Sequence, residues 1–168
     1  MNLQVLLGLL LCQITTADTA ITLIGDGKAP GMMMKTSKWI HAKQWIEGTG
    51  VGNDLTAKLA LGRGDFRINA RLRILKQHKS AASFFLGNNH FGFEGAKETV
   101  FLSGPLFGGV KLLEPSENLV PRGQWLTFQA TRKTGLIQFF INNKEVASVN
   151  HAGSFGVFGF RPWRSTMQ

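Results

Sequence analysis

The 168-residue chain has a single cysteine, Cys12, and few charged side chains. One cysteine cannot form an internal disulfide, which excludes a disulfide-stapled scaffold and a cysteine-based zinc site. Charged residues make up 17% of the chain, below the roughly 25% usual for globular domains. Hydrophobic residues make up 43%, enough to fill a core, so wholesale disorder is excluded. The length favours one domain, since roughly 150 residues per domain is typical.

Apolar runs long enough to cross a membrane are also missing. The leucine-rich segment at the N-terminus falls short of the roughly 18 to 20 residues needed, so we expect no membrane span. Residues 1–17 contain no charged side chain and end in small residues, as a secretory signal does. We predict a signal peptide over 1–17, with cleavage after Ala17 or after Ala20, and a secreted or periplasmic protein. A lipidated Cys12 is the rival interpretation.

Familiar catalytic motifs are absent. The sequence has no Gly-rich phosphate loop before a helix, no His-Glu-x-x-His and no Gly-x-Ser-x-Gly. Carboxylates that hydrolyse glycosides lie about 5 to 10 Å apart, and the candidate pairs, Glu94 with Glu98 and Glu114 with Glu117, are readily explained as solvated turn residues. The four histidines are spread along the chain, so a histidine metal site would need the fold to gather them. We therefore expect no catalytic residue and no metal ligand.

Acidic residues are scarce relative to basic ones, and the net charge is +9. A basic surface concentrates anions such as nucleic acid, anionic lipid or acidic glycan. For a secreted protein we expect acidic glycan and no nucleic acid. Arg67, Arg71 and Arg73, followed by Lys76 and Lys79, form a basic stripe that could track an anionic polymer, although a solvated strand face is the better explanation.

The sequence is rich in short segments in which apolar and polar residues alternate, and turn-forming residues separate these segments. Residues 65–74 alternate apolar and polar side chains with period two, the pattern of a half-buried strand. Residues 55–61 alternate similarly, and the short Gly62–Asp65 connection predicts a hairpin between the two runs. Asn142-Asn143 predicts a two-residue hairpin turn. Further strands are expected at 81–86, 90–93, 99–103, 110–113, 124–131, 136–141, 145–149 and 155–161.

No helix of useful length separates these strands, apart from a possible helical turn within residues 36–47. This pattern predicts an all-β fold, a two-sheet antiparallel jelly-roll sandwich, as a single domain over residues 21–168. Residues 155–160 resemble a central strand. Residues 164–168 begin an extended segment with no closing turn, so we expect the domain to be incomplete at its C-terminus and to leave an unpaired edge.

Two segments combine polar groups with flat aromatics. Asn88–Gly95 offers amide, imidazole and carboxylate groups beside phenylalanines, and Phe160–Arg164 flanks an indole with two guanidinium groups suited to a carboxylate. The alternative is that the aromatics are core and the polar residues turn the chain. We predict that both segments meet at one rim of the sandwich and bind a glycan through Asn89, His90, Glu94, Arg161 and Trp163.

A resemblance supports this interpretation. The runs at 64–72, 83–86, 89–95, 141–146 and 155–161 resemble a concanavalin-like or laminin-G-like jelly roll. The layout from Gly25 to Met167 is similar to the lectin-like module that precedes the catalytic propeller of secreted bacterial exo-sialidase-type glycosidases. The resemblance implies a carbohydrate-binding accessory module beside a downstream catalytic domain. No Ser-x-Asp-x-Gly-x-x-Trp propeller box occurs here, so no sialidase activity is expected of this chain.

Two alternatives stay open. The chain could be a jelly-roll hydrolase of glucans or keto-disaccharides, but the Glu-x-Asp-x-x-Glu strand typical of such glucanases is absent. It could instead be an adhesive domain whose basic face meets polyanions. We expect no cofactor, although laminin-G-like domains often hold Ca²⁺, because the chain has no Asp-rich loop of the EF-hand type.

Overall fold

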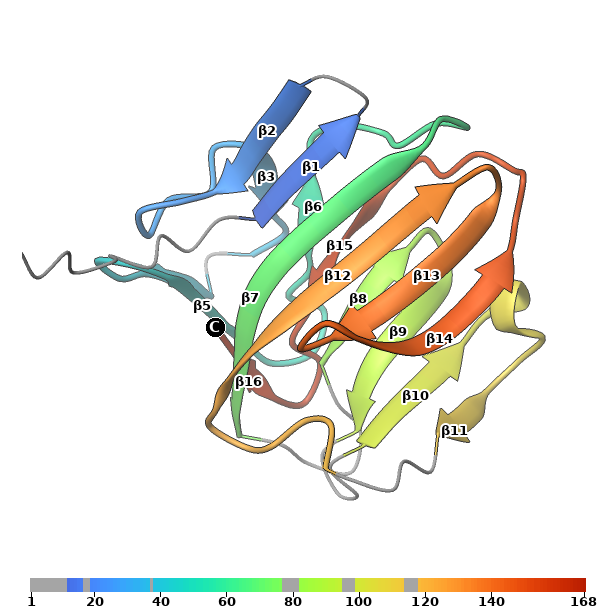
Figure 1. Cartoon of the computed structure of the whole chain (residues 1–168). Coiled ribbons are helices and arrows are strands. Elements are labelled where there is room, and N and C mark those ends of the chain that lie inside the picture. The colour runs from blue at the N-terminus through green and yellow to red at the C-terminus, as the bar shows by residue number, and fades with distance from the viewer. Residues whose placement is uncertain (1–11, 17–18, 37, 77–81, 95–98, 114–117) are drawn as a thin grey trace, which may run out of the picture.

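In the described residues, two antiparallel sheets pack face to face (Figure 1). The structure is a computed structural model, and it describes residues 12–16, 19–36, 38–76, 82–94, 99–113 and 118–168. The larger sheet has the order β14-β13-β12-β7-β16-β5-β4, with β1 and β2 attached beside β7. The smaller has the order β11-β10-β9-β8-β15-β6-β3. This all-β, two-sheet antiparallel sandwich confirms the predicted fold class.

The strands of the larger sheet are β1 (Cys12–Thr16), β2 (Thr19–Ile24), β4 (Trp39–His41), β5 (Ile46–Thr49), β7 (Phe66–Lys76), β12 (Trp125–Lys133), β13 (Leu136–Ile141), β14 (Lys144–Asn150) and β16 (Thr166–Met167). Those of the smaller sheet are β3 (Met32–Met34), β6 (Leu55–Ala57), β8 (Ser83–Leu86), β9 (Asn89–Glu94), β10 (Thr99–Ser103), β11 (Lys111–Leu113) and β15 (Phe158–Arg161). A short 3-10 turn, η1 (Pro105–Phe107), follows β10. In the described part of the chain, no helix is long and apolar enough to cross a membrane.

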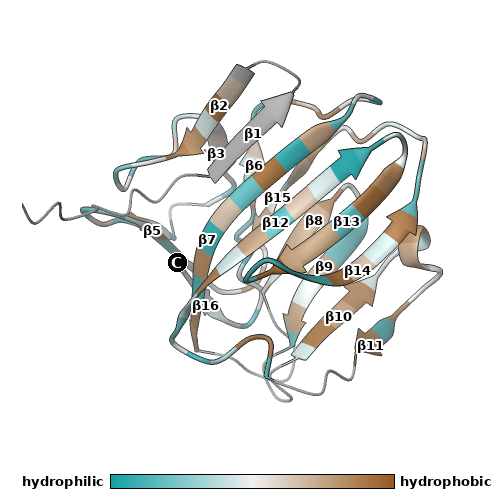
Figure 2. Ribbon diagram, in the orientation of Figure 1, coloured by the Kyte–Doolittle hydropathy of each residue, from teal (hydrophilic) through white to brown (hydrophobic). Residues whose placement is uncertain are grey.

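Strand alternation builds the core. Along β7, the apolar residues at even positions from Phe66 to Ile74 are buried, while Arg67 and Arg71 are exposed, and Figure 2 shows the resulting bands of opposite hydropathy. Aromatic rings from the two sheets meet between them, with Phe84 and Phe128 5.0 Å apart at their centroids. Such pairs add to the stability gained by burying apolar surface.

The predicted turn at Asn142-Asn143 is confirmed. Both residues have positive φ, 49° and 65°, as a type I′ hairpin requires and as asparagine tolerates. The Asn142 Oδ1 also accepts a hydrogen bond of 2.9 Å from the backbone N–H of Thr127. The turn therefore joins β13 to β14 and also ties them to β12.

The predicted hairpin between 55–61 and 66–74 is wrong. β6 pairs with β3 and β15 in the smaller sheet, whereas β7 belongs to the larger one, so Gly62–Asp65 crosses between sheets. The buried Arg132 of β12 fixes this crossover, because its Nε donates to the Gly64 carbonyl at 2.8 Å and its guanidinium reaches the Gly62 and Gly153 carbonyls.

The possible helical turn within 36–47 is also wrong, because this segment forms the β4–β5 hairpin. The buried Trp39 lies against Gly48, where a Cβ atom would come within 2.6 Å of the indole. This contact requires the two residues to face each other across paired strands. The favoured conformation is thus set by packing of Trp39 rather than by local propensity.

The C-terminal segment differs from expectation as well. β15 lies between β8 and β6, which confirms it as a central strand. β16 pairs with β5 on one side and with β7 on the other, so residues 166–167 lie inside the sheet and form no unpaired edge. At the other end, β1 pairs with β2 and β7. Cleavage after Ala17 would remove β1, and the signal peptide stays a prediction.

Candidate functional site

Two of the residues predicted to bind a glycan meet on the outer face of the smaller sheet. Arg161 pairs with Ser83 across β15 and β8, and the Ser83 Oγ lies 3.2 Å from the Nδ1 of His90 on β9. Burial and the positive charge of Arg161 lower the pKa of His90 to about 4, while Asp54 acts in the opposite direction. His90 is therefore a neutral imidazole at pH 7.

Trp163 adds an aromatic plane to this cluster. The guanidinium carbon of Arg161 lies 4.5 Å from the centroid of the indole. Burial lowers the pKa of Arg161, and Asp54 partly offsets that effect. The Arg161 Nε and the Asp54 Oδ1 are both buried and have no hydrogen-bond partner in the described part of the chain, and Asp54 forms an ion pair of 3.7 Å with Lys35. The cluster is polar but tightly packed, and Ser83 is inaccessible to solvent.

Asn89 and Glu94 contribute differently from what the sequence predicted. The Asn89 amide donates to the Leu86 carbonyl at 3.0 Å, and its oxygen accepts from the Leu106 N–H at 2.7 Å, so its side chain holds the turn. Glu94 lies half-buried at the far end of β9. The structure thus brings together His90, Arg161 and Trp163, and leaves Asn89 with a structural role. Glycan binding by this set stays a prediction.

The outer face of the larger sheet carries a second group of polar and aromatic side chains. A surface hollow of about 280 Å³ lies over β7, β12 and β13, and its outward-facing lining residues are Asn69, Arg71, Thr127, Gln129, Phe140 and Asn143. The register places Asn69, Gln129 and Phe140 side by side in one row across the three strands. The Gln129 Nε2 donates to the Asn69 Oδ1 at 2.6 Å, and among the described residues the Asn69 NH₂ and the Gln129 Oε1 make no further hydrogen bond. These groups present hydrogen-bond donors and acceptors beside one aromatic ring.

Guanidinium and indole groups lie over one another beside the hollow, on the outer face of β7 and its neighbours. The guanidinium carbons of Arg71 and Arg73 lie 5.0 and 4.7 Å from the Trp125 centroid, and Trp45 meets Trp125 edge-on at 6.3 Å. The Arg73 Nε donates to the Gln168 Oε1 at 2.8 Å, and the Gln168 amide donates to Glu47 at 2.5 Å. Arg73 is therefore held in place, whereas Arg71 is exposed beside the hollow.

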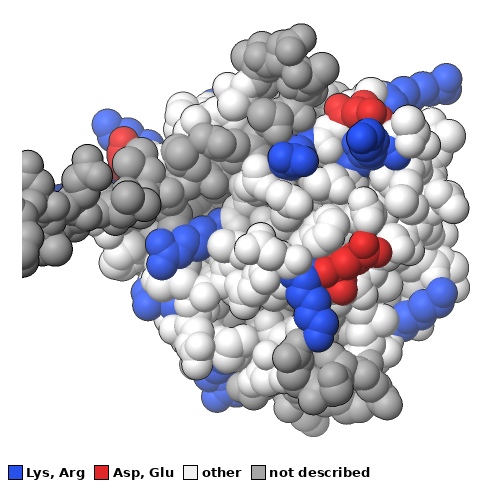
Figure 3. All heavy atoms as spheres, viewed as in Figure 1, with Lys and Arg blue, Asp and Glu red and all other residues white. Residues whose placement is uncertain are grey.

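Acidic groups are missing from the lining of this hollow, as far as the described residues extend. Figure 3 shows Lys and Arg dispersed over this face among uncharged residues, with Asp and Glu at fewer places. Hydrolysis of a glycoside canonically uses two carboxylates flanking the bond, and the described lining offers no such pair. Glu98, Glu114 and Glu117 lie outside the described residues. Within the described ranges, no three His, Cys, Asp or Glu side chains cluster as a metal site.

Part of this hollow could be predicted from the sequence. The basic stripe already contained Arg71 and Arg73, but the amide, hydroxyl and aromatic partners on β12 and β13 were missed. They could have been found by listing the outward positions of residues 124–131 and 136–141, which alternate with buried ones. Their convergence also depends on the register between strands, which the alternation alone does not fix.

The sequence matches no protein-family model and no curated protein. Solved structures share its fold at low identity. A carbohydrate-binding module, CBM66, from Bacillus subtilis has a TM-score of 0.63 at 13% identity, covering 82% of this chain and 90% of that one. A Bacillus licheniformis β-glucanase has a TM-score of 0.60 at 11% identity, with 91% and 79% covered. Sheep galectin-11 has a TM-score of 0.51 at 15% identity, with 71% and 100% covered.

These structures comprise a carbohydrate-binding module, a glucanase and a galectin by name, so the shared fold does not separate binding from hydrolysis. They support the concanavalin-like part of the predicted resemblance. The sialidase part stays a prediction. The chain is a concanavalin-like jelly-roll sandwich.

Proposed function

We propose that the protein is a carbohydrate-binding module that holds a glycan on the outer face of its larger sheet. The observation that carries the proposal is the row of Asn69, Gln129 and Phe140 in a hollow of about 280 Å³. Amide groups hydrogen-bond sugar hydroxyls, and an aromatic ring can lie against a sugar face. The volume lies near the lower end of the roughly 300 to 1,000 Å³ typical of small-molecule pockets, so one sugar ring would occupy it.

The preferred glycan is acidic. Arg71 is exposed at the edge of the hollow, and a guanidinium can hold a carboxylate through two parallel hydrogen bonds. The lack of a carboxylate pair in the described lining favours binding over hydrolysis. A role as an accessory module beside a sialidase-type catalytic domain, and a secreted or periplasmic location, belong to the same proposal and rest on the sequence.

Calorimetric titration of the folded protein with a uronate-containing oligosaccharide and its neutral counterpart tests this proposal. Gln129→Ala should weaken the binding of both ligands about fivefold, since a lost hydrogen bond costs on the order of 1 kcal/mol. Arg71→Met should weaken binding of the uronate-containing oligosaccharide only. Arg67→Met is the matched control, because Arg67 is also exposed on β7 but lies outside the hollow.

Two results would contradict the proposal. Equal losses from Arg67→Met and Arg71→Met, abolished by 0.15 M salt, would support an adhesive basic face, because diffuse charge is screened over about 8 Å at that ionic strength. A loss confined to Trp163→Ala would instead place the glycan on the smaller sheet, at the site predicted from the sequence.

A further inference from the structure

Three rows of outward-facing side chains cross β7 and β12 on the outer face of the larger sheet. The antiparallel register places their members opposite each other: Asn69 with Gln129, Arg71 with Thr127, and Arg73 with Trp125. Successive outward positions on a strand are about 7 Å apart, so the third row lies about 14 Å from the first. The first two rows line the hollow, and the third lies beyond its lining.

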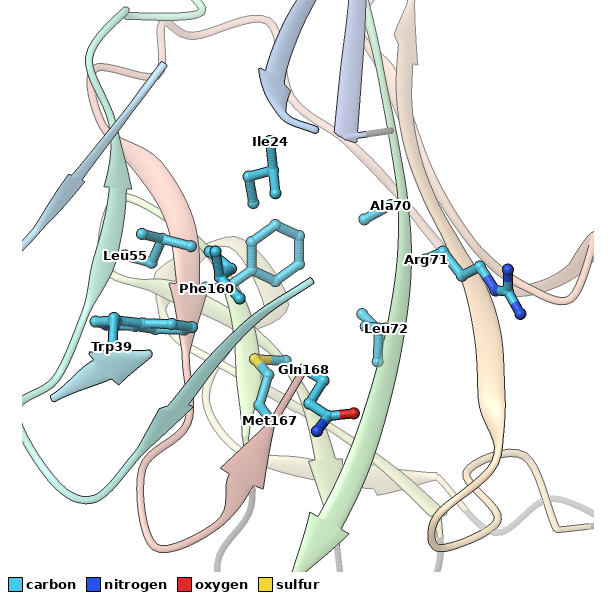
Figure 4. A pocket seen from close by; sticks show the side chains of 10 residues that line it. Ile24, Trp39, Leu55, Ala70, Arg71, Leu72, Phe160, Met167 and Gln168 are labelled. Atoms are coloured by element: carbon cyan, nitrogen blue, oxygen red, sulfur yellow. The ribbon is translucent and has the colours of Figure 1, made fainter. Parts of the chain in front are cut away.

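The side chains between these rows face the opposite way. Ala70 and Leu72 point into an apolar pocket between the two sheets, whereas Arg71 points to the other side of β7 (Figure 4). Residues 66–73 of β7 are all paired with β12, so the pocket and the three rows are separate spaces. A ligand of the rows therefore stays on the outer face.

The third row carries aromatic surface that is partly open to solvent. Trp125 is half-buried, and so is Trp45, which meets it edge-on with ring centroids 6.3 Å apart. The guanidinium carbons of Arg71 and Arg73 lie 5.0 and 4.7 Å from the centroid of the Trp125 ring. The solvent-facing part of this aromatic pair can lie against the apolar face of a sugar ring.

Positive charge is available in the second row rather than the third. The Arg73 Nε donates to the Gln168 Oε1 at 2.8 Å, and the Gln168 amide donates to Glu47 at 2.5 Å. Arg71 is exposed between the amides of the first row and the indole of the third. Because Trp125 already orients the Arg71 guanidinium, less side-chain freedom is lost when Arg71 binds an anion. The rows thus offer a place for one anionic group with a sugar ring on either side.

We infer that this face binds a linear acidic glycan over at least two consecutive sugar units. One unit occupies the hollow, the next lies against Trp125, and a carboxylate between them meets Arg71. The inference rests on the proposed function and names its ligand class, which is an extended uronate chain rather than a single terminal sugar. The distance of about 14 Å from the first row to the third is more than one sugar ring covers.

Calorimetric titration with galacturonic acid and its linear trimer tests this inference. Trp125→Ala should weaken binding of the trimer about eightfold more than binding of the monomer, the factor expected from about 50 Å² of uncovered indole surface. Thr131→Ala is the control, because Thr131 is also half-buried on β12 but pairs with Arg67, outside the hollow and at the other end from Trp125.

The two ligands separate this inference from the proposed function. An equal loss for monomer and trimer in Trp125→Ala would overturn the inference, because Trp125 would then act only by orienting Arg71. It would leave the sugar site in the hollow standing. If neither ligand binds the unsubstituted protein, both the inference and the proposed function are wrong.

The indole N–H resonance of Trp125 offers a readout that needs no variant. At equal saturation it should shift more with the trimer than with the monomer, because only the trimer reaches the third row. Equal shifts with the two ligands would overturn the inference. A shift of the Trp163 resonance alone would place the glycan on the smaller sheet and overturn the proposed function as well.

Discussion

At the scale of single residues, environment decides the chemistry of the charged groups. His90 and Arg161 are both half-buried on the smaller sheet, and burial lowers the pKa of each; His90, with a pKa of about 4, is uncharged at neutral pH. Arg71 and Arg73 lie two positions apart on β7, but Gln168 holds Arg73 while Arg71 faces solvent. The side chain that is exposed and stacked on Trp125 is the one suited to meet an anionic ligand.

The lowered pKa of His90 predicts that stability falls on acidification. Its pKa drops from 6.5 to about 4 on folding, mainly through burial and then through Arg161, against the opposing effect of Asp54. Between these two values the unfolded chain binds a proton that the folded chain does not, so the free energy of unfolding decreases as pH falls from about 6.5 to 4. Urea unfolding at several pH values measures this decrease. In His90→Gln the decrease should be smaller, and an unchanged pH slope would contradict the assignment.

At the scale of strands, some elements could be predicted from the local sequence pattern, whereas others depend on tertiary contacts. β7, β12 and β13 follow from period-two alternation, since each has one buried and one wet face. The β4–β5 hairpin could not be predicted the same way, because it depends on Trp39 packing on Gly48. The sheet assignment of β6 was equally inaccessible, because its partners β3 and β15 lie on either side of it in the chain, and β15 is about 100 residues away.

The candidate site, like the strands, could be predicted only in part from the sequence. The alternation located Arg71 and Arg73 on a wet face. It did not show that Asn69, Gln129 and Phe140 share one row, because that depends on two strand registers. On the smaller sheet, His90, Arg161 and Trp163 lie near one another, and glycan binding by them stays a prediction. The sequence did not show that turn formation occupies the Asn89 amide.

Close approach of strands predicts a severe effect at Gly159 in β15. A Cβ atom there would lie 2.0 Å from the Leu55 carbonyl oxygen, a backbone atom of the paired strand β6. Gly159→Ala should therefore force β6 and β15 apart and lower the free energy of unfolding by about 3 kcal/mol or more. Gly156→Ala, in the same segment with open space around it, is the control and should change stability little. Similar urea midpoints for the two variants would contradict this packing.

At the scale of the whole molecule, the two sheets have different roles. The smaller sheet and the inner faces supply the aromatic core, which fixes the register of β7, β12 and β13. The outer face of the larger sheet is then free to present polar groups at fixed spacing. Function on a rigid face of this kind needs little reorganisation on binding.

The measurement that tests this account most directly is a nuclear magnetic resonance titration of the ¹⁵N-labelled protein with an acidic oligosaccharide. We predict that the largest amide shifts occur at the hollow of the larger sheet, at Asn69, Arg71, Thr127, Gln129, Phe140 and Asn143. Shifts centred on β9 and β15, or scattered over every exposed lysine and arginine, would contradict the central claim that the larger sheet binds the glycan.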